Sequence, residues 1–167
     1  MTHHLIDNGF TALLFISEAI GSVNTRRERR DAFCDTVAQV ENIRSETAEV
    51  ALQQPEQIRE CILGFLQRHA QQTCAIIPAN GTLTLQVMKV LQAEGIECGR
   101  DIGLAGFDEM SWSSLAGRGI TTLKQPTHQI GYSALQSVIE RIKHPGTEPV
   151  DQFFSGELVI RGSSSLA

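Results

Sequence analysis

The chain of 167 residues has the composition of an ordinary globular domain, with 41% hydrophobic and 20% charged residues. These proportions exclude collagen, coiled coil and disorder, and the length is enough for a core that needs neither disulfide nor structural metal. The formal net charge of -5 lacks the basic footprint of a nucleic-acid binder, so we expect no DNA binding by this chain alone.

Strand-like and helix-like patterns alternate along the chain. Short apolar segments predict strands, and segments with apolar residues at helical spacing predict helices between and after them. The strands are expected at Thr11–Ile16, Glu46–Leu52, Thr73–Pro78 and Ile102–Phe107. The helices are expected from near Arg26, from Pro55, from Leu83 to Gly95, and from Thr127 to Lys143.

This alternation predicts an α/β fold, in which a parallel sheet is flanked by helices. Sheets of this kind bind ligands beyond the carboxyl ends of their strands, so the residues that follow each strand are the candidates for function. Polar residues stand at these places: Arg29 in the helix after the first strand, Asn80 after the third, Asp108 after the fourth, and Gln125 after the segment 120–124. We expect all of them at one edge of the sheet.

An arginine cluster opens the helix that follows the first strand. Arg29 lies one turn before Phe33 on the apolar stripe of this helix, so its side chain should point inward. Cations at a helix start oppose the helix dipole, whereas an anion is favoured there, so the cluster indicates a bound anion. Arg26, Arg27 and Arg30 are better explained as a solvated face balanced by neighbouring acids.

The amide of Asn80 and the carboxylate of Asp108 suit a ligand rich in hydroxyl groups. Each residue type also commonly caps the helix that follows a strand, and the sequence leaves both interpretations open. Trp112, the single tryptophan, either covers a sugar face or packs a short helix, and packing is favoured.

Catalytic and metal-binding patterns are not found. No P-loop, G-x-S-x-G or G-x-G-x-x-G motif follows a strand. His69 and His128 have no partner at metal-ligand or triad spacing and are expected to be structural. We therefore predict no enzyme activity, no metal and no cofactor.

The cysteines and the start of the chain favour a cytoplasmic location. Phe10–Ile16 is too short to span a bilayer, and no basic residues precede it as in a signal peptide. Cys34, Cys61, Cys74 and Cys98 are widely spaced without a C-x-x-C, which favours reduced thiols over a disulfide or zinc framework. We expect no membrane contact.

Several segments resemble the lac repressor/galactose repressor (LacI) family of bacterial transcription regulators, nearly from end to end. The most specific are D-I-G-L-A-G-F-D at 101–108, T-T-x-x-Q-P at 121–126 and E-L-V-I-R-G-S at 157–163, in the family's order. The resemblance implies an effector-binding domain of the periplasmic-binding-protein type, with two α/β lobes around a sugar-sized cleft, in a cytoplasmic dimer.

The family architecture also implies how the chain divides. Residues 1–118 and 150–167 would form the second lobe, and 119–149 would supply a crossover strand and helix of the first lobe. Most of the first lobe and the DNA-binding head have no counterpart in these residues, so operator DNA would be contacted only through that region. A half-cleft should bind its effector weakly.

Family positions that contact the effector match candidate residues of this chain. By resemblance, the ligand-binding residues are Thr25, Arg29, Asn80, Asp108 and Gln125, with Trp112 as a further candidate. Gly81 stands where the family has an acid after Ala-Asn, so one hydrogen bond or cap is lost. The segment from Phe107 to Trp112 is similar to the branch that responds to gluconate-type sugar acids, which favours a sugar acid over a neutral sugar.

The leading hypothesis is the sugar-responsive effector-binding and dimerisation portion of a LacI-type regulator. Its ligand would act through different affinities for open and closed states. The helix from Leu83 to Glu94 is the expected dimer surface, by analogy only. The alternative is a periplasmic sugar-binding protein of an ABC transporter, and a small α/β enzyme is a distant third.

Overall fold

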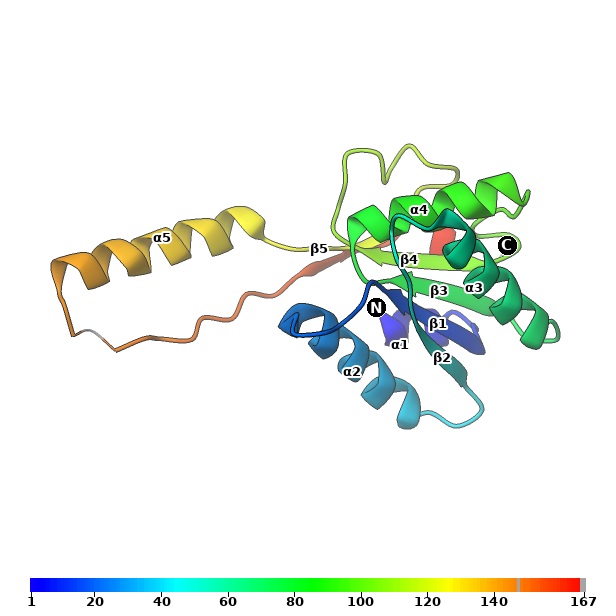
Figure 1. The fold of residues 1–167 in the computed structure, drawn as a ribbon, viewed down its shortest axis with the longest axis horizontal. Coiled ribbons are helices and arrows are strands. Elements are labelled where there is room, and N and C mark those ends of the chain that lie inside the picture. The colour runs from blue at the N-terminus through cyan, green and yellow to red at the C-terminus, as the bar shows by residue number, and fades with distance from the viewer. Residues whose placement is uncertain (147, 166–167) are drawn as a thin grey trace.

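The computed structural model describes residues 1–146 and 148–165. Its six strands form one sheet, and helices lie on both faces (Figure 1). The strands are β1 (Ala12–Ser17), β2 (Arg44–Glu49), β3 (Cys74–Pro78), β4 (Gly103–Phe107), β5 (Thr121–Lys124) and β6 (Glu157–Val159). The helices are α1 (Thr2–Asp7), α2 (Asn24–Ala38), α3 (Pro55–Arg68), α4 (Gly81–Ala93), α5 (Thr127–Lys143) and the short 3-10 helix η1 (Gly162–Ser164).

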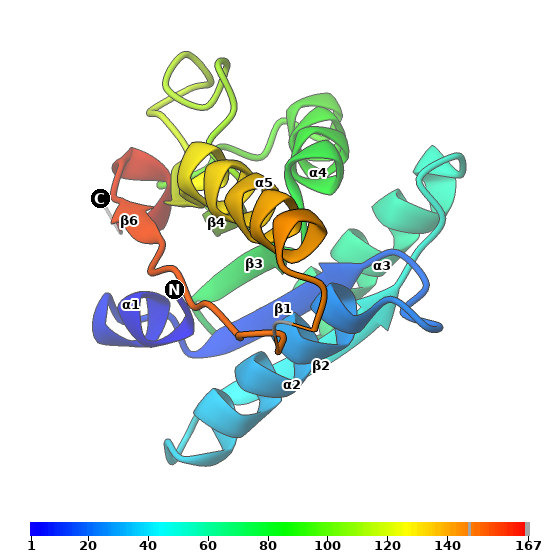
Figure 2. The same ribbon diagram turned by 90° about the vertical axis from the view of Figure 1, so that its left-hand side faces the viewer.

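The strand order is β2-β1-β3-β4-β5-β6, and β6 alone runs antiparallel to its neighbour. Successive side chains of a strand point to opposite faces, so β1 supplies both cores. Leu14 packs with residues of α3 and α4, whereas Leu13 and Phe15 pack with residues of α1 and α2. Figure 2 shows these two pairs of helices on opposite sides of the sheet. The predicted α/β class is confirmed, with a mixed rather than wholly parallel sheet.

The predicted second strand differs most from the structure, and the predicted start of the helix after the first strand also differs. The second strand was expected at Glu46–Leu52, but β2 begins at Arg44 and ends at Glu49, in register with β1 from Ala12 to Ser17. β2 is an edge strand with mostly exposed side chains, so its polar first residues carry no apolar signal. α2 begins at Asn24, two residues before Arg26.

The predicted assignment of residues 119–149 to another lobe is wrong for the strand. β5 is hydrogen-bonded to β4 on one side and to β6 on the other, and Thr121 and Thr122 are buried. Hydrogen bonds within this sheet therefore make β5 part of the same lobe. Residues 147, 166 and 167, which the predicted segments 119–149 and 150–167 include, lie outside the described residues.

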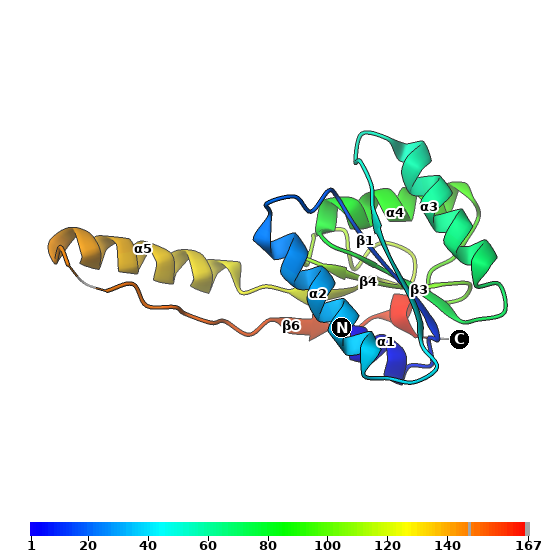
Figure 3. The ribbon, with the colours of Figure 1, turned by 60° about the horizontal axis from the view of Figure 1, so that its bottom comes forward.

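α5 lies away from this body. It projects from the edge of the sheet where β5 ends, and the chain returns beside it to β6 (Figure 3). No residue of α5 is buried against the described part of the chain, and its apolar side chains Leu135 and Ile142 are 59% and 72% exposed. That α5 packs on a first lobe stays a prediction.

Three further sequence expectations can be compared with the structure. The four cysteines are free thiols, as expected, although Cys74 alone is buried. His69 is structural, because its ring bonds to Glu46 at 2.8 Å and to Gln72 at 3.1 Å. Over the described ranges, no helix combines the length and apolar character that crossing a bilayer requires.

Candidate functional site

The candidate residues follow strands that end at the edge of the sheet from which α5 projects, and Figure 1 shows this edge. The parallel strands β1, β3, β4 and β5 all end there. The next residues along the chain are Glu18, Ala79–Asn80, Asp108 and Gln125. Parallel pairing therefore brings these polar groups together from four distant segments, as predicted.

Arg29 reaches into this edge from α2. Its Nη1 donates a hydrogen bond to the carbonyl oxygen of Ala79 at 2.5 Å, and its guanidinium carbon lies 4.2 Å from the ring centroid of Phe107. The inward orientation is therefore confirmed. Burial lowers the pKa of Arg29, and the nearby charge of Asp108 partly opposes this shift. The guanidinium stays charged at neutral pH.

The other arginines of α2 have local partners. Arg26 pairs with Glu18 at 2.8 Å, Arg30 pairs with Asp31 at 2.7 Å, and Arg27 donates to the amide oxygen of Asn24. Within the described residues, Arg29 has no carboxylate oxygen at ion-pair distance. Its half-buried charge therefore remains available to an anionic or hydroxyl-rich ligand.

Asp108 joins the start of α4 to the segment after β5. One carboxylate oxygen accepts a hydrogen bond from the amide of Gln125 at 2.5 Å, and the other accepts the backbone N–H of Gly81 at 3.1 Å. Its backbone has a positive φ of 70°, which aspartate adopts more readily than most residues. Both oxygens are thus aligned by the protein itself.

Asn80 confirms the capping interpretation. Its side-chain oxygen accepts the backbone N–H of Leu83 at 2.9 Å, which caps α4, and its amide nitrogen donates to Glu18 at 2.9 Å. Its neighbours Ala79 and Gly81 are the residues bound by Arg29 and Asp108. Asn80 therefore lies within the same cluster and orders its backbone.

A pocket of about 460 Å³ opens beside this cluster, between the sheet and the helices α1 and α2. Thr25, Arg29, Phe107 and Gln125 contribute to its wall, whereas Asn80 and Asp108 do not. Thr25 is exposed at the start of α2.

Trp112 does not join the other candidates. It is partly buried against the core on the α4 side, and it lines a separate groove between α4 and the 112–120 loop. The structure therefore separates it from the other predicted ligand-binding residues, because the loop after β4 folds back over α4 before it reaches β5. The favoured packing interpretation is confirmed.

Two residues of this edge were not among the predicted ligand-binding residues. Phe107, which lies under the guanidinium of Arg29, is the last residue of β4 and was predicted only as the end of a strand. Glu18 follows β1 as Asn80 follows β3, and it binds both Asn80 and Arg26. The position of Glu18 directly after a predicted strand was a usable signal.

Comparison with known proteins shows the family. Residues 2–164 match the model of the periplasmic binding protein-like domain. The transcriptional regulator KdgR of Bacillus subtilis is 30% identical over 93% of this chain and 46% of its own length. The regulator PtxS of Pseudomonas plecoglossicida is 31% identical, over 98% of this chain and 47% of its own length. The chain belongs to the LacI family. It spans about half the length of these curated relatives and covers only their effector-domain region.

Solved structures of LacI-family members share this fold. A probable maltose operon transcriptional repressor from Staphylococcus aureus superimposes with a TM-score of 0.86 at 26% identity, over 98% of this chain and 57% of its own. A LacI-family regulator from Enterococcus faecalis with bound ribose has a TM-score of 0.81 at 19% identity, over 99% and 59%. These relatives are transcriptional regulators. The comparison therefore does not favour the alternative of a periplasmic sugar-binding protein of an ABC transporter.

Proposed function

We propose that this LacI-family chain binds a small sugar or sugar acid at the carboxyl edge of its sheet and belongs to a transcriptional regulator. The observation that carries the proposal is Arg29. It is a half-buried cation, stacked on Phe107, in a pocket wall that also includes Glu28, and no carboxylate among the described residues lies at ion-pair distance from it. Partial burial disfavours this charge, so a ligand anion would stabilise it.

The pocket wall favours a sugar acid. The guanidinium of Arg29 suits a carboxylate, and the amide of Gln125 and the hydroxyl of Thr25 suit sugar hydroxyls. The N-cap residue of α2, Val23, has no side-chain acceptor, so the first N–H groups of this helix also favour an anion nearby. Asp108, held beside this wall through Gln125, supplies an acceptor for hydroxyl protons.

The regulatory role comes from the relatives. KdgR and PtxS are transcriptional regulators, and a lac repressor dimer of the same fold has been solved bound to operator. We propose that this chain acts in the cytoplasm as the sensing part of such a regulator, without catalytic activity. Operator DNA would be bound outside these residues, because the net charge of -5 disfavours a polyanion.

Dimerisation is part of the same proposal. The outer face of α4 and the loop that follows β4 form an apolar groove of about 730 Å³, which includes Leu85, Met88, Trp112 and Leu115. Leu115 is 82% exposed there. An exposed apolar surface of this kind is typical of a protein interface. This groove agrees with the expectation that α4 carries the dimer contact.

Calorimetry tests the effector proposal. The chain is titrated with D-gluconate and with ribose, and then Arg29→Met and the matched surface variant Arg30→Met are titrated in the same way. We expect heat with gluconate, its loss in Arg29→Met and its retention in Arg30→Met, because Arg30 pairs with Asp31 at the surface. Heat with ribose alone contradicts the anionic effector, and equal heats for Arg29→Met and the unmodified chain contradict the site.

A further inference from the structure

Two strands connect α5 to the body of the molecule. β5 leads out to α5 and β6 returns from it, and they pair antiparallel at Thr122 with Val159, Leu123 with Leu158, and Lys124 with Glu157. No residue of α5 itself is buried against the described part of the chain. The direction of α5 is therefore set by whatever holds these two strands.

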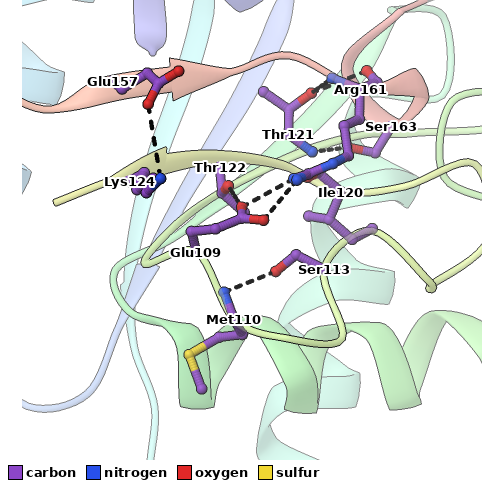
Figure 4. A network of polar contacts seen from close by, with 10 residues as sticks. All are labelled: Glu109, Met110, Ser113, Ile120, Thr121, Thr122, Lys124, Glu157, Arg161 and Ser163. Carbon is purple, nitrogen blue, oxygen red and sulfur yellow. Dashed lines mark hydrogen bonds and ion pairs between the residues drawn. The ribbon is translucent and has the colours of Figure 1, made fainter.

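Glu109 holds both of them, as Figure 4 shows. One of its carboxylate oxygens accepts a hydrogen bond from Nη2 of Arg161 at 2.6 Å, just beyond β6. The other accepts from Nη1 of Arg161 at 3.0 Å and from the hydroxyl of Thr122 in β5. A bidentate arginine–carboxylate pair of this kind fixes the relative orientation of the two side chains as well as their distance.

We call Glu109 and Arg161 together the clamp. Arg161 makes further hydrogen bonds to residues in and next to β5. Its Nη1 also donates to the carbonyl oxygen of Ile120 at 2.7 Å, directly before β5. Its backbone N–H donates to the hydroxyl of Thr121 at 2.9 Å, and that hydroxyl can donate to the carbonyl oxygen of Arg161 at 3.0 Å. The side chains of Glu109 and Arg161 are only 23% and 19% exposed. The pair is therefore more shielded from water than the ion pair of Lys124 and Glu157 on the same two strands.

A contrasting ion pair lies further out on the same two strands. Lys124 and Glu157 are 4.0 Å apart, and their side chains are 56% and 72% exposed. Exposed pairs at this separation contribute little to orientation or stability. Lys124–Glu157 is therefore a matched control for the partly buried pair of Glu109 and Arg161.

The clamp also lies next to the candidate ligand site in sequence. Asp108 precedes Glu109 and binds Gln125, the residue that follows β5, while its backbone N–H donates to the carbonyl oxygen of Leu123 at 3.1 Å. The left-handed backbone of Asp108 turns these consecutive carboxylates toward different partners. Asp108 is hydrogen-bonded to Gln125 in the pocket wall, and Glu109 holds the strands that carry α5.

We propose that Glu109 and Arg161 are positioning residues that set the direction of α5 and link it to occupancy of the site at Asp108 and Gln125. The link rests on the function proposed above, whereas the positioning role does not. A ligand that draws Gln125 away from Asp108 shifts the end of β5, and the clamp transmits this shift to β6. Both strands then move as one unit, and α5 moves with them.

Pulsed electron paramagnetic resonance tests the positioning role. Spin labels are placed at Ser137 on α5 and Gln67 on α3, which are both exposed, through p-acetylphenylalanine because the native thiols are free. We expect a distance distribution that is about twofold wider in Glu109→Gln and unchanged in Glu157→Gln. Arg161→Lys keeps the charge but loses the bidentate geometry, so we expect a distance distribution of intermediate width. This variant serves as the test if Glu109→Gln does not fold. A distance distribution for Glu109→Gln that is as narrow as that of the unmodified chain would overturn the proposal. If Glu109→Gln does not fold, the same result for Arg161→Lys would overturn it.

A second arm adds D-gluconate as the probe and tests the link. We expect gluconate to shift the mean distance in the unmodified chain, and to bind Glu109→Gln with similar heat but without that shift. The same shift in both proteins overturns the link. An absence of gluconate heat in the unmodified chain counts against the proposed function and the link together, whereas the widths measured without ligand still decide the positioning role.

Discussion

Replacing Asn80 separates its role as a helix cap from its role in the cluster. Asn80→Ala removes the acceptor for the N–H of Leu83 and the donor to Glu18. Loss of an N-cap side chain costs about 1 kcal/mol, and loss of a half-buried hydrogen bond to a carboxylate adds about 0.5–1.5 kcal/mol. We therefore expect the free energy of unfolding to fall by about 1.5–2.5 kcal/mol.

Asn80→Ser is the matched variant, because serine keeps a cap acceptor but does not supply the amide donor to Glu18. Its expected loss is about half that of Asn80→Ala. Urea unfolding followed by the fluorescence of Trp112 measures both, since this single tryptophan packs against the core. Equal losses in the two variants, or no loss in Asn80→Ala, would refute the assignment of the cap to this side chain.

Further predictions concern packing, pH and reactivity. A Cβ at Gly103 would lie 2.5 Å from ring atoms of Phe10, so Gly103→Ala should lower the free energy of unfolding by about 1–3 kcal/mol, measured in urea. Gly131→Ala on α5 meets no atom within 4 Å and should raise helical content by circular dichroism, and a drop in helicity would contradict the exposed helix. Hydrogen bonding by its arginine partner lowers the pKa of Glu109 below its ordinary 4.5, so the stability that this carboxylate contributes is present above 4.5 and is lost as pH falls through the lower folded value. The urea midpoint of Glu109→Gln should accordingly depend less on pH in this acidic range than that of the unmodified chain, and identical profiles would exclude the pair as a cause. Partial burial raises the pKa of Cys98 to about 12, so mass spectrometry should find it unmodified by iodoacetamide near pH 8, whereas rapid alkylation would contradict this raised pKa.

The sequence predicts the centre of the sheet well because burial on both faces leaves a direct mark on composition. β3 is apolar throughout and buried throughout, and its expected and observed ranges differ by one residue. β2 is displaced because an edge strand exposes polar residues such as Arg44 and Ser45. The pairing of β5 with β6 depends on contacts between segments far apart in the chain, which local periodicity does not encode.

The candidate site was predictable in position but not in its contacts. The rule that ligands bind beyond the carboxyl ends of parallel strands places Asn80, Asp108 and Gln125 at one edge. Their partners depend on backbone groups such as the N–H of Leu83, which residue type alone does not reveal. Trp112 lies apart from these residues because the loop after β4 turns back over α4 before reaching β5.

A nuclear magnetic resonance titration of the ¹⁵N-labelled chain with D-gluconate tests the central claim most directly. The cluster predicts that shift changes concentrate on the Nε–H of Arg29, the backbone amides of Asn80 and Asp108, and the side-chain amide of Gln125, and that they saturate together. Shift changes confined to the groove beside Trp112, or spread evenly over the surface, would contradict a ligand site at the carboxyl edge of the sheet.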